Sequence, residues 1–140
     1  MIVLDTNVVS ALMQREPDRA VIEWLDSVPA ESVWTTAITV FEVRFGLALL
    51  AASSRRRQLE DAFIRALEED LESRSLPFDN SAAQVAGVMA AKRRRAGRPV
   101  EIRDTLIAGI VAARKATLAT RNTKHFAGID LSLVDPWAAS

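Results

Sequence analysis

The sequence predicts an α/β fold, a three-layer α/β/α sandwich around a parallel sheet of four or five strands. Short runs rich in β-branched residues alternate with longer segments of helical periodicity, which is the pattern of repeated β–α–β units. The 140 residues fit a single domain, residues 1–140, and an apolar content of 49% is ample for a buried core. We find neither an internal repeat nor a linker.

The strands are expected where β-branched and aromatic residues gather in short runs. The second of them, Val33-Trp34-Thr35-Thr36, is typical. The expected strands are residues 1–4, 33–36, 75–78, 117–120 and 131–134. Because helical segments separate them, the connections are long enough for parallel pairing.

The helices are expected between these strands, with starts and stops set by capping residues, Pro and Gly. They are a helix after Asp5-Thr6-Asn7 to about Met13, a second from Pro17 through Leu25, a third from Ile38 to about Ala52, a fourth at 55–72, a fifth from Asp79 or Asn80 to Gly97, and a sixth from Asp104 to about Arg114. Thr36 or Thr39 is the expected cap of the third helix. Pro99 follows Gly97, which favours a sharp end to the fifth.

Composition excludes several classes of protein. Cysteine is absent, so disulfides, Cys–zinc sites and thiol catalysis are excluded. No apolar run, such as residues 106–113, is longer than eight residues, whereas a membrane span needs about 20. The opening Met1-Ile2-Val3-Leu4-Asp5 lacks the basic start of a signal peptide. We therefore expect a soluble, cytoplasmic protein with no membrane partner.

The net charge of zero conceals an asymmetry along the chain. Residues 1–70 contain seven basic and twelve acidic side chains, and residues 71–140 contain eleven and six. A uniformly basic nucleic-acid binder is therefore not indicated, but a local basic patch is compatible with the sequence.

Three acidic residues are expected at one crevice, because open α/β sheets bind ligands beyond the carboxyl ends of their strands. Asp5 follows the first strand, and Glu42 lies about one and a half turns into the helix after the second. Asp104 opens a helix that is almost wholly apolar and should be buried. A buried carboxylate needs a partner, and Mg²⁺ accepts one or two carboxylates with water and phosphate oxygens. Asp5, Glu42 and Asp104 would supply such a site and leave room for a phosphodiester.

Each of these acids also has a purely structural interpretation. Asp5 has the position of an N-cap for the first helix. Glu42 completes a capping box in Thr39-Val40-Phe41-Glu42. Asp104 would be favoured in the first helical turn by the helix dipole.

Five segments in this order resemble PIN-domain ribonucleases, and most nearly the FitB-like branch of the VapC toxins of bacterial toxin–antitoxin pairs. They are MIVLDTN at 1–7, TVFEVRFG at 39–46, RPVEIRDTLIA at 98–108, ATLATRN at 116–122 and DPW at 135–137. The resemblance covers essentially the whole chain. It implies a PIN-like fold and a Mg²⁺- or Mn²⁺-dependent endoribonuclease with Asp5, Glu42 and Asp104 as metal ligands.

The same resemblance implies further residues and partners. The fourth acidic position of the family falls at Asn122, which can ligate through its carbonyl but adds no negative charge and so weakens the case for a second metal. Thr6 corresponds to the hydroxyl beside the first acid and is a candidate to bind substrate. The family also implies a homodimer and a small antitoxin whose C-terminal segment occludes the crevice. DNA would be contacted only indirectly, through the antitoxin.

Basic residues near the expected crevice are candidates for phosphate contacts. They are Arg121 and Lys124 after a late strand, and Arg94 and Arg98 in and after the basic run Lys92-Arg93-Arg94-Arg95. A basic helix C-terminus explains that run equally well, since the helix dipole favours it. We expect His125 and Glu101 at the surface, with His125 near the mouth of the crevice.

The alternative hypothesis is a non-catalytic PIN-like binding module that acts through an antitoxin–DNA complex. In that case the acids hold a structural cation or a basic partner segment. Asn122 is compatible with this alternative, because the missing charge weakens the acidic cluster.

Overall fold

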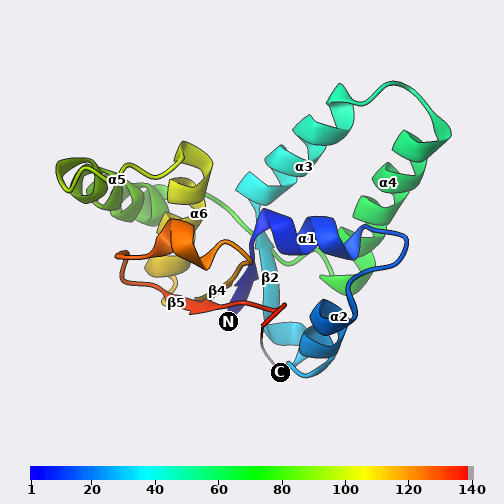
Figure 1. The fold of residues 1–140 in the computed structure, drawn as a ribbon, viewed down its shortest axis with the longest axis horizontal. Coiled ribbons are helices and arrows are strands. Elements are labelled where there is room, and N and C mark those ends of the chain that lie inside the picture. Colours follow the sequence, from blue (N-terminus) through cyan, green and yellow to red (C-terminus); the bar gives the residue numbers. More distant parts are fainter. Residues whose placement is uncertain (139–140) are drawn as a thin grey trace.

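The computed structural model describes residues 1–138, and the last two residues of the expected 1–140 domain lie outside the described residues. Within the described part, five parallel strands form one sheet in the order β3-β2-β1-β4-β5. They are β1 (Ile2–Leu4), β2 (Val33–Thr36), β3 (Ser75–Leu76), β4 (Thr117–Ala119) and β5 (Ser132–Val134). The predicted fold class is therefore confirmed, and Figure 1 shows the sheet with helices on both sides.

The helices join successive strands. They are α1 (Thr6–Leu12), α2 (Arg19–Asp26), α3 (Ala37–Leu49), α4 (Ser54–Arg65), α5 (Asn80–Arg95) and α6 (Ile102–Ala113). Shorter turns of 3₁₀ helix are η1 (Ala30–Ser32) and η3 (Thr123–Phe126), and a π-helical turn, η2 (Ala66–Asp70), continues α4. In Figure 1, α5 and α6 lie together on one side of the molecule, and α3 and α4 project from the other.

Two apolar cores lie on opposite faces of the sheet, because successive side chains of a strand point to opposite sides. Leu4 packs with residues of α1 to α4, including Val9 and Phe63. Val3, one residue earlier, packs with the other core, which includes Ile107 of α6. This alternation within β1 explains the three layers.

The register places the site-forming ends of the strands together. In β1, Ile2 pairs with Val33 of β2, and Leu4 pairs with Ala119 of β4. The residues that follow β1 and β4, Asp5 and Thr120, therefore meet at the same edge. This edge is where ligands bind in open α/β sheets.

Three element boundaries differ from the prediction. The second helix begins at Arg19 rather than Pro17, because the Asp18 side chain accepts a hydrogen bond from the Ala20 N–H and caps it. The third is capped by Thr36, begins at Ala37 and ends at Leu49. The sixth begins at Ile102 rather than Asp104, because Glu101 caps it.

The remaining differences are small. The predicted strands at 75–78, 117–120 and 131–134 are shortened to β3, β4 and β5, and the helix expected at 55–72 becomes α4 followed by η2. Gly97, the expected stop of the fifth helix, has φ +70°, which suits the left-handed turn beyond the Ala96 cap.

Close packing of α5 on α6 depends on Gly109. A Cβ atom at this position would lie 2.6 Å from the Ala86 Cβ and 2.7 Å from the Ala82 carbonyl oxygen. We expect Gly109→Ala to lower the free energy of unfolding by about 1–3 kcal/mol, because overpacking outweighs the better helix propensity of Ala. Urea denaturation measures the change.

The matched control is Gly87→Ala in α5, where a Cβ would meet nothing within 4 Å. That substitution should leave stability unchanged or raise it by up to about 1 kcal/mol. Equal effects at both positions would contradict the packing argument.

No helix within residues 1–138 combines the length and apolar character that crossing a membrane requires.

Candidate active site

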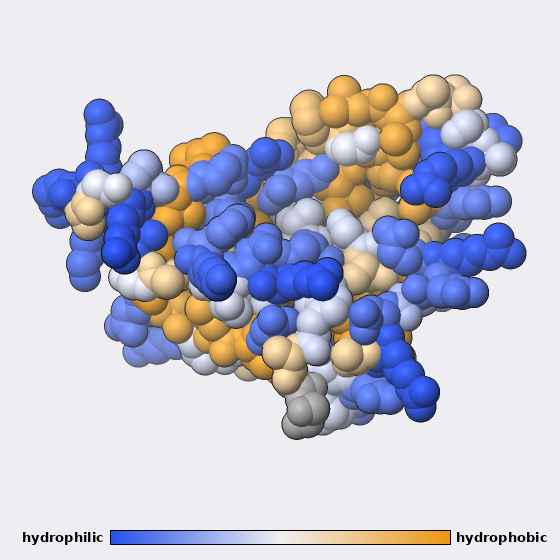
Figure 2. Space-filling view, in the orientation of Figure 1, coloured by the Kyte–Doolittle hydropathy of each residue, from blue (hydrophilic) through white to orange (hydrophobic). Residues whose placement is uncertain are grey.

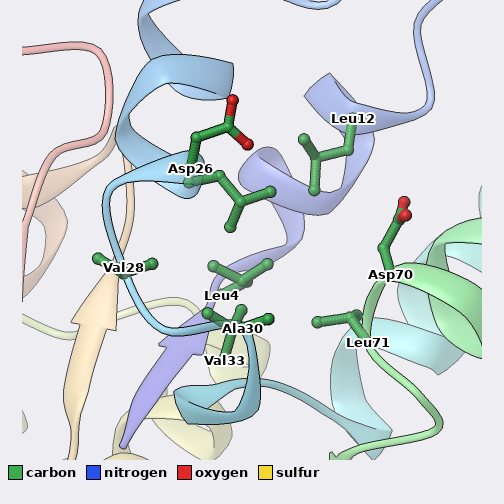
Figure 3. Close-up of a pocket in the computed structure, with 9 residues that line it drawn as sticks. Leu4, Leu12, Asp26, Val28, Ala30, Val33, Asp70 and Leu71 are labelled. Carbon is green, nitrogen blue, oxygen red and sulfur yellow. The ribbon is translucent and has the colours of Figure 1, made fainter.

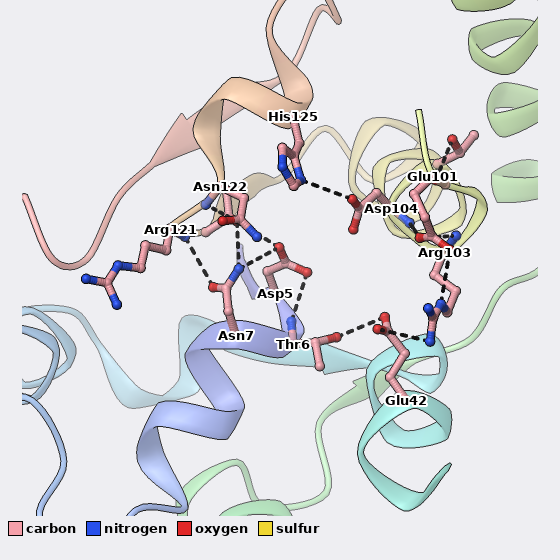
Figure 4. A network of polar contacts seen from close by, with 12 residues as sticks. Asp5, Thr6, Asn7, Glu42, Glu101, Arg103, Asp104, Arg121, Asn122 and His125 are labelled. Carbon is pink, nitrogen blue, oxygen red and sulfur yellow. Dashed lines mark hydrogen bonds and ion pairs between the residues drawn. The ribbon is translucent and has the colours of Figure 1, made fainter. Parts of the chain in front are cut away.

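Asp5, Glu42 and Asp104 come from three different elements and surround a common space (Figure 4). Asp5 follows β1 and caps α1, Glu42 lies in α3, and Asp104 lies in the first turn of α6. Their mutual effects on pKa, described below, reflect this proximity. The structure therefore brings together the three acids that the sequence selected.

Asp5 is only 3% exposed and is held by hydrogen bonds on both carboxylate oxygens. Oδ1 accepts from the Thr6 backbone N–H at 2.8 Å, as the N-cap interpretation predicted. Oδ2 accepts from Thr120 Oγ1 at 2.7 Å and from Asn7 Nδ2 at 3.3 Å. Burial raises the pKa of Asp5, and these hydrogen bonds oppose that rise only in part. Asp5 is therefore both a cap and a fixed, desolvated carboxylate.

Glu42 is not part of a capping box, contrary to that interpretation. Because Thr36 caps α3, Glu42 is the sixth helical residue and lies too far along to reach the cap. Its Oε1 instead accepts a hydrogen bond from Thr6 Oγ1 at 3.1 Å, and its Oε2 lies 3.8 Å from an Arg103 Nη1. Burial raises the pKa of Glu42, and the charges of Asp5 and Asp104 add to this rise.

Asp104 lies in the first turn of α6, where the helix dipole favours an acid. Its Oδ2 is 3.5 Å from His125 Nδ1, and His125 is exposed near the site as expected. Burial raises the pKa of Asp104, and the nearby charges of Asp5 and Glu101 raise it further. Asp104 is therefore favoured by the helix dipole and is also one of the acids of the site.

Glu101 is exposed, as expected, but it is also the N-cap of α6. Its carboxylate accepts from the backbone N–H groups of Arg103 and Asp104 at 2.9 and 3.2 Å. Burial acts to raise the pKa of Glu101, but the hydrogen bonds from Arg103 and Asp104 outweigh it and the net shift is downward. Glu101 thus stays ionised and fixes the start of the helix that carries Asp104.

The donor set suits a hard divalent cation in its chemistry. The three carboxylates repel one another, and a cation would relieve that repulsion. Within residues 1–138, no three acidic or histidine side chains are already gathered at distances that hold a metal ion. A cation would therefore have to draw these carboxylates together.

Arg103 supplies a positive charge to Glu42 and is bonded through Nε to Glu101 Oε1 at 3.1 Å. We expect Arg103→Gln to raise the pKa of Glu42, because the opposing charge is lost while burial and the Asp5 and Asp104 charges remain. A pH titration of the Glu42 carboxyl carbon by NMR measures this.

Arg114→Gln is the matched control, because Arg114 lies just after α6, is similarly exposed, and pairs with Asp79 instead. It should leave the Glu42 titration unchanged. An unaltered Glu42 titration in Arg103→Gln would show that the ion pair between Arg103 and Glu42, at 3.8 Å, does not affect the pKa of Glu42.

The residues predicted to bind substrate lie in different surroundings. Thr6 is inside the site, where its hydroxyl contacts Glu42 and Thr39. The Arg121 guanidinium lies over the Trp137 ring at 4.9 Å and points away from the acids (Figure 4). Lys124 lines a cleft beside Asp104. Arg94 and Arg98 are exposed, in the last turn of α5 and just beyond it.

Asn122 follows β4 by three residues and precedes η3. Its backbone N–H donates to Thr120 Oγ1 at 3.0 Å, and Figure 4 shows it beside Asp5. The structure therefore places this amide at the same edge of the sheet as the acids.

Sequence reasoning assigned no role in the site to three residues that shape it. Thr120 and Asn7 share Asp5 Oδ2, and Asn7 Oδ1 also accepts from the Arg121 N–H at 3.2 Å. Arg103 balances Glu42. The available signals were the position of Thr120 directly after a strand and of Arg103 directly before an acid.

A separate, largely apolar pocket of about 270 Å³ lies between α1, α2 and the end of η2 (Figure 3). Asp26 and Asp70 are the two acids among its lining residues, and burial raises the pKa of Asp70. None of the three site acids lines it. This pocket is therefore separate from the candidate active site.

The fold and site define an α/β protein with a carboxylate centre, suited to a divalent cation, at the carboxyl edge of a parallel sheet. The PIN domain family model matches residues 2–130. The chain belongs to the PIN domain family.

Relatives and solved structures agree with this assignment. "VapC ribonuclease Y4jK" of Sinorhizobium fredii is 39% identical over 98% of both chains. "Toxin FitB" of Neisseria gonorrhoeae is 34% identical over 98% of this chain and 99% of its own. A structure of FitAB bound to an IR36 DNA fragment has a TM-score of 0.89 at 33% identity, covering 100% of this chain and 98% of that chain.

Proposed function

We propose that this protein is a Mg²⁺-dependent endoribonuclease and the toxin of a type II toxin–antitoxin system. The observation that carries the proposal is the convergence of Asp5, Glu42 and Asp104 on one space at the carboxyl edge of the sheet. The names of the relatives support it, since they include a VapC ribonuclease and a FitB toxin. PIN-domain nucleases of this kind generally depend on a divalent metal.

Asp5, Glu42 and Asp104 would hold Mg²⁺, or Mn²⁺ in its place. Such an ion, when bound, would lower the pKa of a water and would stabilise negative charge on the departing oxygen of the phosphodiester. Asp5 is the fixed member, because two hydrogen bonds to Oδ2 and one to Oδ1 leave its carboxylate little freedom. Thr6 orients Glu42 toward the site through its hydroxyl.

Asn122 would act at the edge of the site without adding charge. Its carbonyl oxygen can ligate or hold a water, as an amide does. With three carboxylates rather than four, the site favours one cation over two.

Partners and location belong to the same proposal. The structures similar to this chain include FitAB and VapBC complexes, some bound to DNA. We infer a small antitoxin as partner, DNA contact only through it, a homodimer, and a cytoplasmic location where RNA is available.

The exposed apolar face of α3 is the surface best suited to such protein contacts. Phe41, Phe45 and Leu49, spaced four residues apart, are 58, 51 and 72% exposed. Figure 2 shows the apolar surface over this helix. Patches of this kind on otherwise polar surfaces mark interaction sites.

The test is cleavage of a mixed RNA pool by purified protein with Mg²⁺ or Mn²⁺, and with EDTA. Cutting only in the presence of metal supports the proposal. Absence of cutting by folded protein, with several RNA pools and both metals, favours the non-catalytic binding module instead.

A further inference from the structure

We propose that the cleft beside Asp104 binds one nucleotide of single-stranded RNA next to the scissile phosphate, with Lys124 contacting a backbone phosphate. This inference rests on the proposed function, and it specifies on which side of the three acids the RNA chain extends. The cleft has a volume of about 400 Å³. It is formed by the last turn of α5, the 96–101 segment, the start of α6, and η3. Its lining residues are Arg93, Pro99, Val100, Glu101, Asp104, Lys124 and His125.

The walls of the cleft differ in chemistry in a way that matches a nucleotide. Lys124 and Arg93 supply positive charge, Pro99 and Val100 supply apolar surface, and Glu101 and Asp104 supply carboxylates. Asp104, which also lines the cleft, is one of the acids that surround the site. A phosphate beside Lys124 and a base or ribose against Pro99 and Val100 would therefore lead directly to the cleavage position.

Lys124 is available for such a contact. It is exposed, and none of the ion pairs within residues 1–138 uses it. Arg93 has a different role, because an Nη1 donates to the Ala127 carbonyl oxygen and so ties α5 to the segment after η3. A Cβ at Gly128 would lie 2.8 Å from that Nη1, so a side chain there would displace the guanidinium. Arg93 thus helps to fix the position of η3, which carries Lys124.

The opposite side of the site is less suited to binding an RNA strand. Arg121, the basic residue on that side, has its guanidinium over the Trp137 ring at 4.9 Å. Figure 4 shows it directed away from Asp5 and Asp104. The asymmetry favours the Lys124 side as the substrate path.

The first measurement is fluorescence anisotropy of a labelled single-stranded RNA oligomer of mixed sequence, in EDTA, over a series of salt concentrations, with RNA integrity checked on gels. The logarithm of the association constant falls linearly with the logarithm of the salt concentration. Removing one phosphate contact to single-stranded nucleic acid makes this slope shallower by about 0.7. We expect Lys124→Ala to show this change and to weaken binding about three- to tenfold at about 50 mM salt. Lys124→Glu should weaken it further.

Two further variants separate the parts of the proposal. Val100→Ser should weaken binding while leaving the salt slope unchanged, because it removes apolar contact and no charge. Arg57→Ala, on exposed α4, is the matched control for loss of one positive charge and should change neither quantity.

The outcomes distinguish this inference from the proposed function. Equal effects of Lys124→Ala and Arg57→Ala, or no RNA binding by the wild type at low salt, overturn the cleft assignment whether or not RNA is cut. A slope change specific to Lys124 supports it, even if the wild type proves unable to cleave RNA.

Discussion

Asp5→Asn is expected to abolish RNA cleavage, with kcat/KM falling at least about a thousandfold, equivalent to about 4 kcal/mol of transition-state stabilisation. The carboxylate is buried and fixed by Thr6 and Thr120, so its charge cannot be replaced by a neighbouring group that swings in. An amide keeps an oxygen to accept from the Thr6 N–H, but it removes one of three negative charges on the cation. The fold should therefore survive while cleavage is lost.

The measurement is single-turnover cleavage of a defined RNA with Mg²⁺, with circular dichroism to check folding. Asp61→Asn, an exposed acid of α4, is the matched control and should cleave at the wild-type rate. Activity of folded Asp5→Asn within tenfold of the wild type would remove Asp5 from the metal site.

Asp104→Asn is expected to lose cleavage and to gain stability in the absence of metal. Burial and the charge of Asp5 raise the pKa of Asp104 above its ordinary value of 3.8. As pH rises, the unfolded chain releases this proton before the folded protein does, so ionisation costs stability, and the cost is complete above the raised pKa. At neutral pH we expect the variant to be more stable by about 1 kcal/mol, or roughly 3 °C in Tm.

Thermal unfolding in EDTA at several pH values tests this. The advantage of Asp104→Asn should disappear below the ordinary pKa, where the wild-type carboxyl is protonated in both states. Added Mg²⁺ should raise the Tm of the wild type more than that of the variant, because a ligand stabilises only the state that binds it. A variant equal to or less stable than the wild type at every pH would contradict the electrostatic argument.

Much of the fold could be predicted because its signals are local. The alternation of short β-branched runs with helical segments predicted the parallel sheet, and Gly97 marked the end of α5. The errors concern helix starts. Glu101 and Asp18 are caps, and each lies within three residues of another plausible start. Local propensity cannot choose between neighbouring caps, since tertiary packing decides which one the helix uses.

The acids of the site could be predicted because each stands at a strand end or opens a buried helix. Their partners could not. The hydrogen bond from Thr120 to Asp5 joins residues 115 positions apart, and the pair between Arg103 and Glu42 joins α6 to α3. Such contacts depend on the register of the sheet and on how helices pack, and no spacing in the sequence encodes either. The structure-based pKa directions depend on the same long-range arrangement.

Because β1 lies in the middle of the sheet, the order in which the chain is synthesised determines when the site can form. β1 is made first, yet one of its two neighbours, β4, begins at residue 117, and the Thr120 hydroxyl that orients Asp5 comes later still. An interrupted chain that stops before β4 carries Asp5, Glu42 and Asp104 but lacks the strand that positions the first of them. A cell making this protein would thus hold no competent nuclease until β4 and Thr120 have left the ribosome.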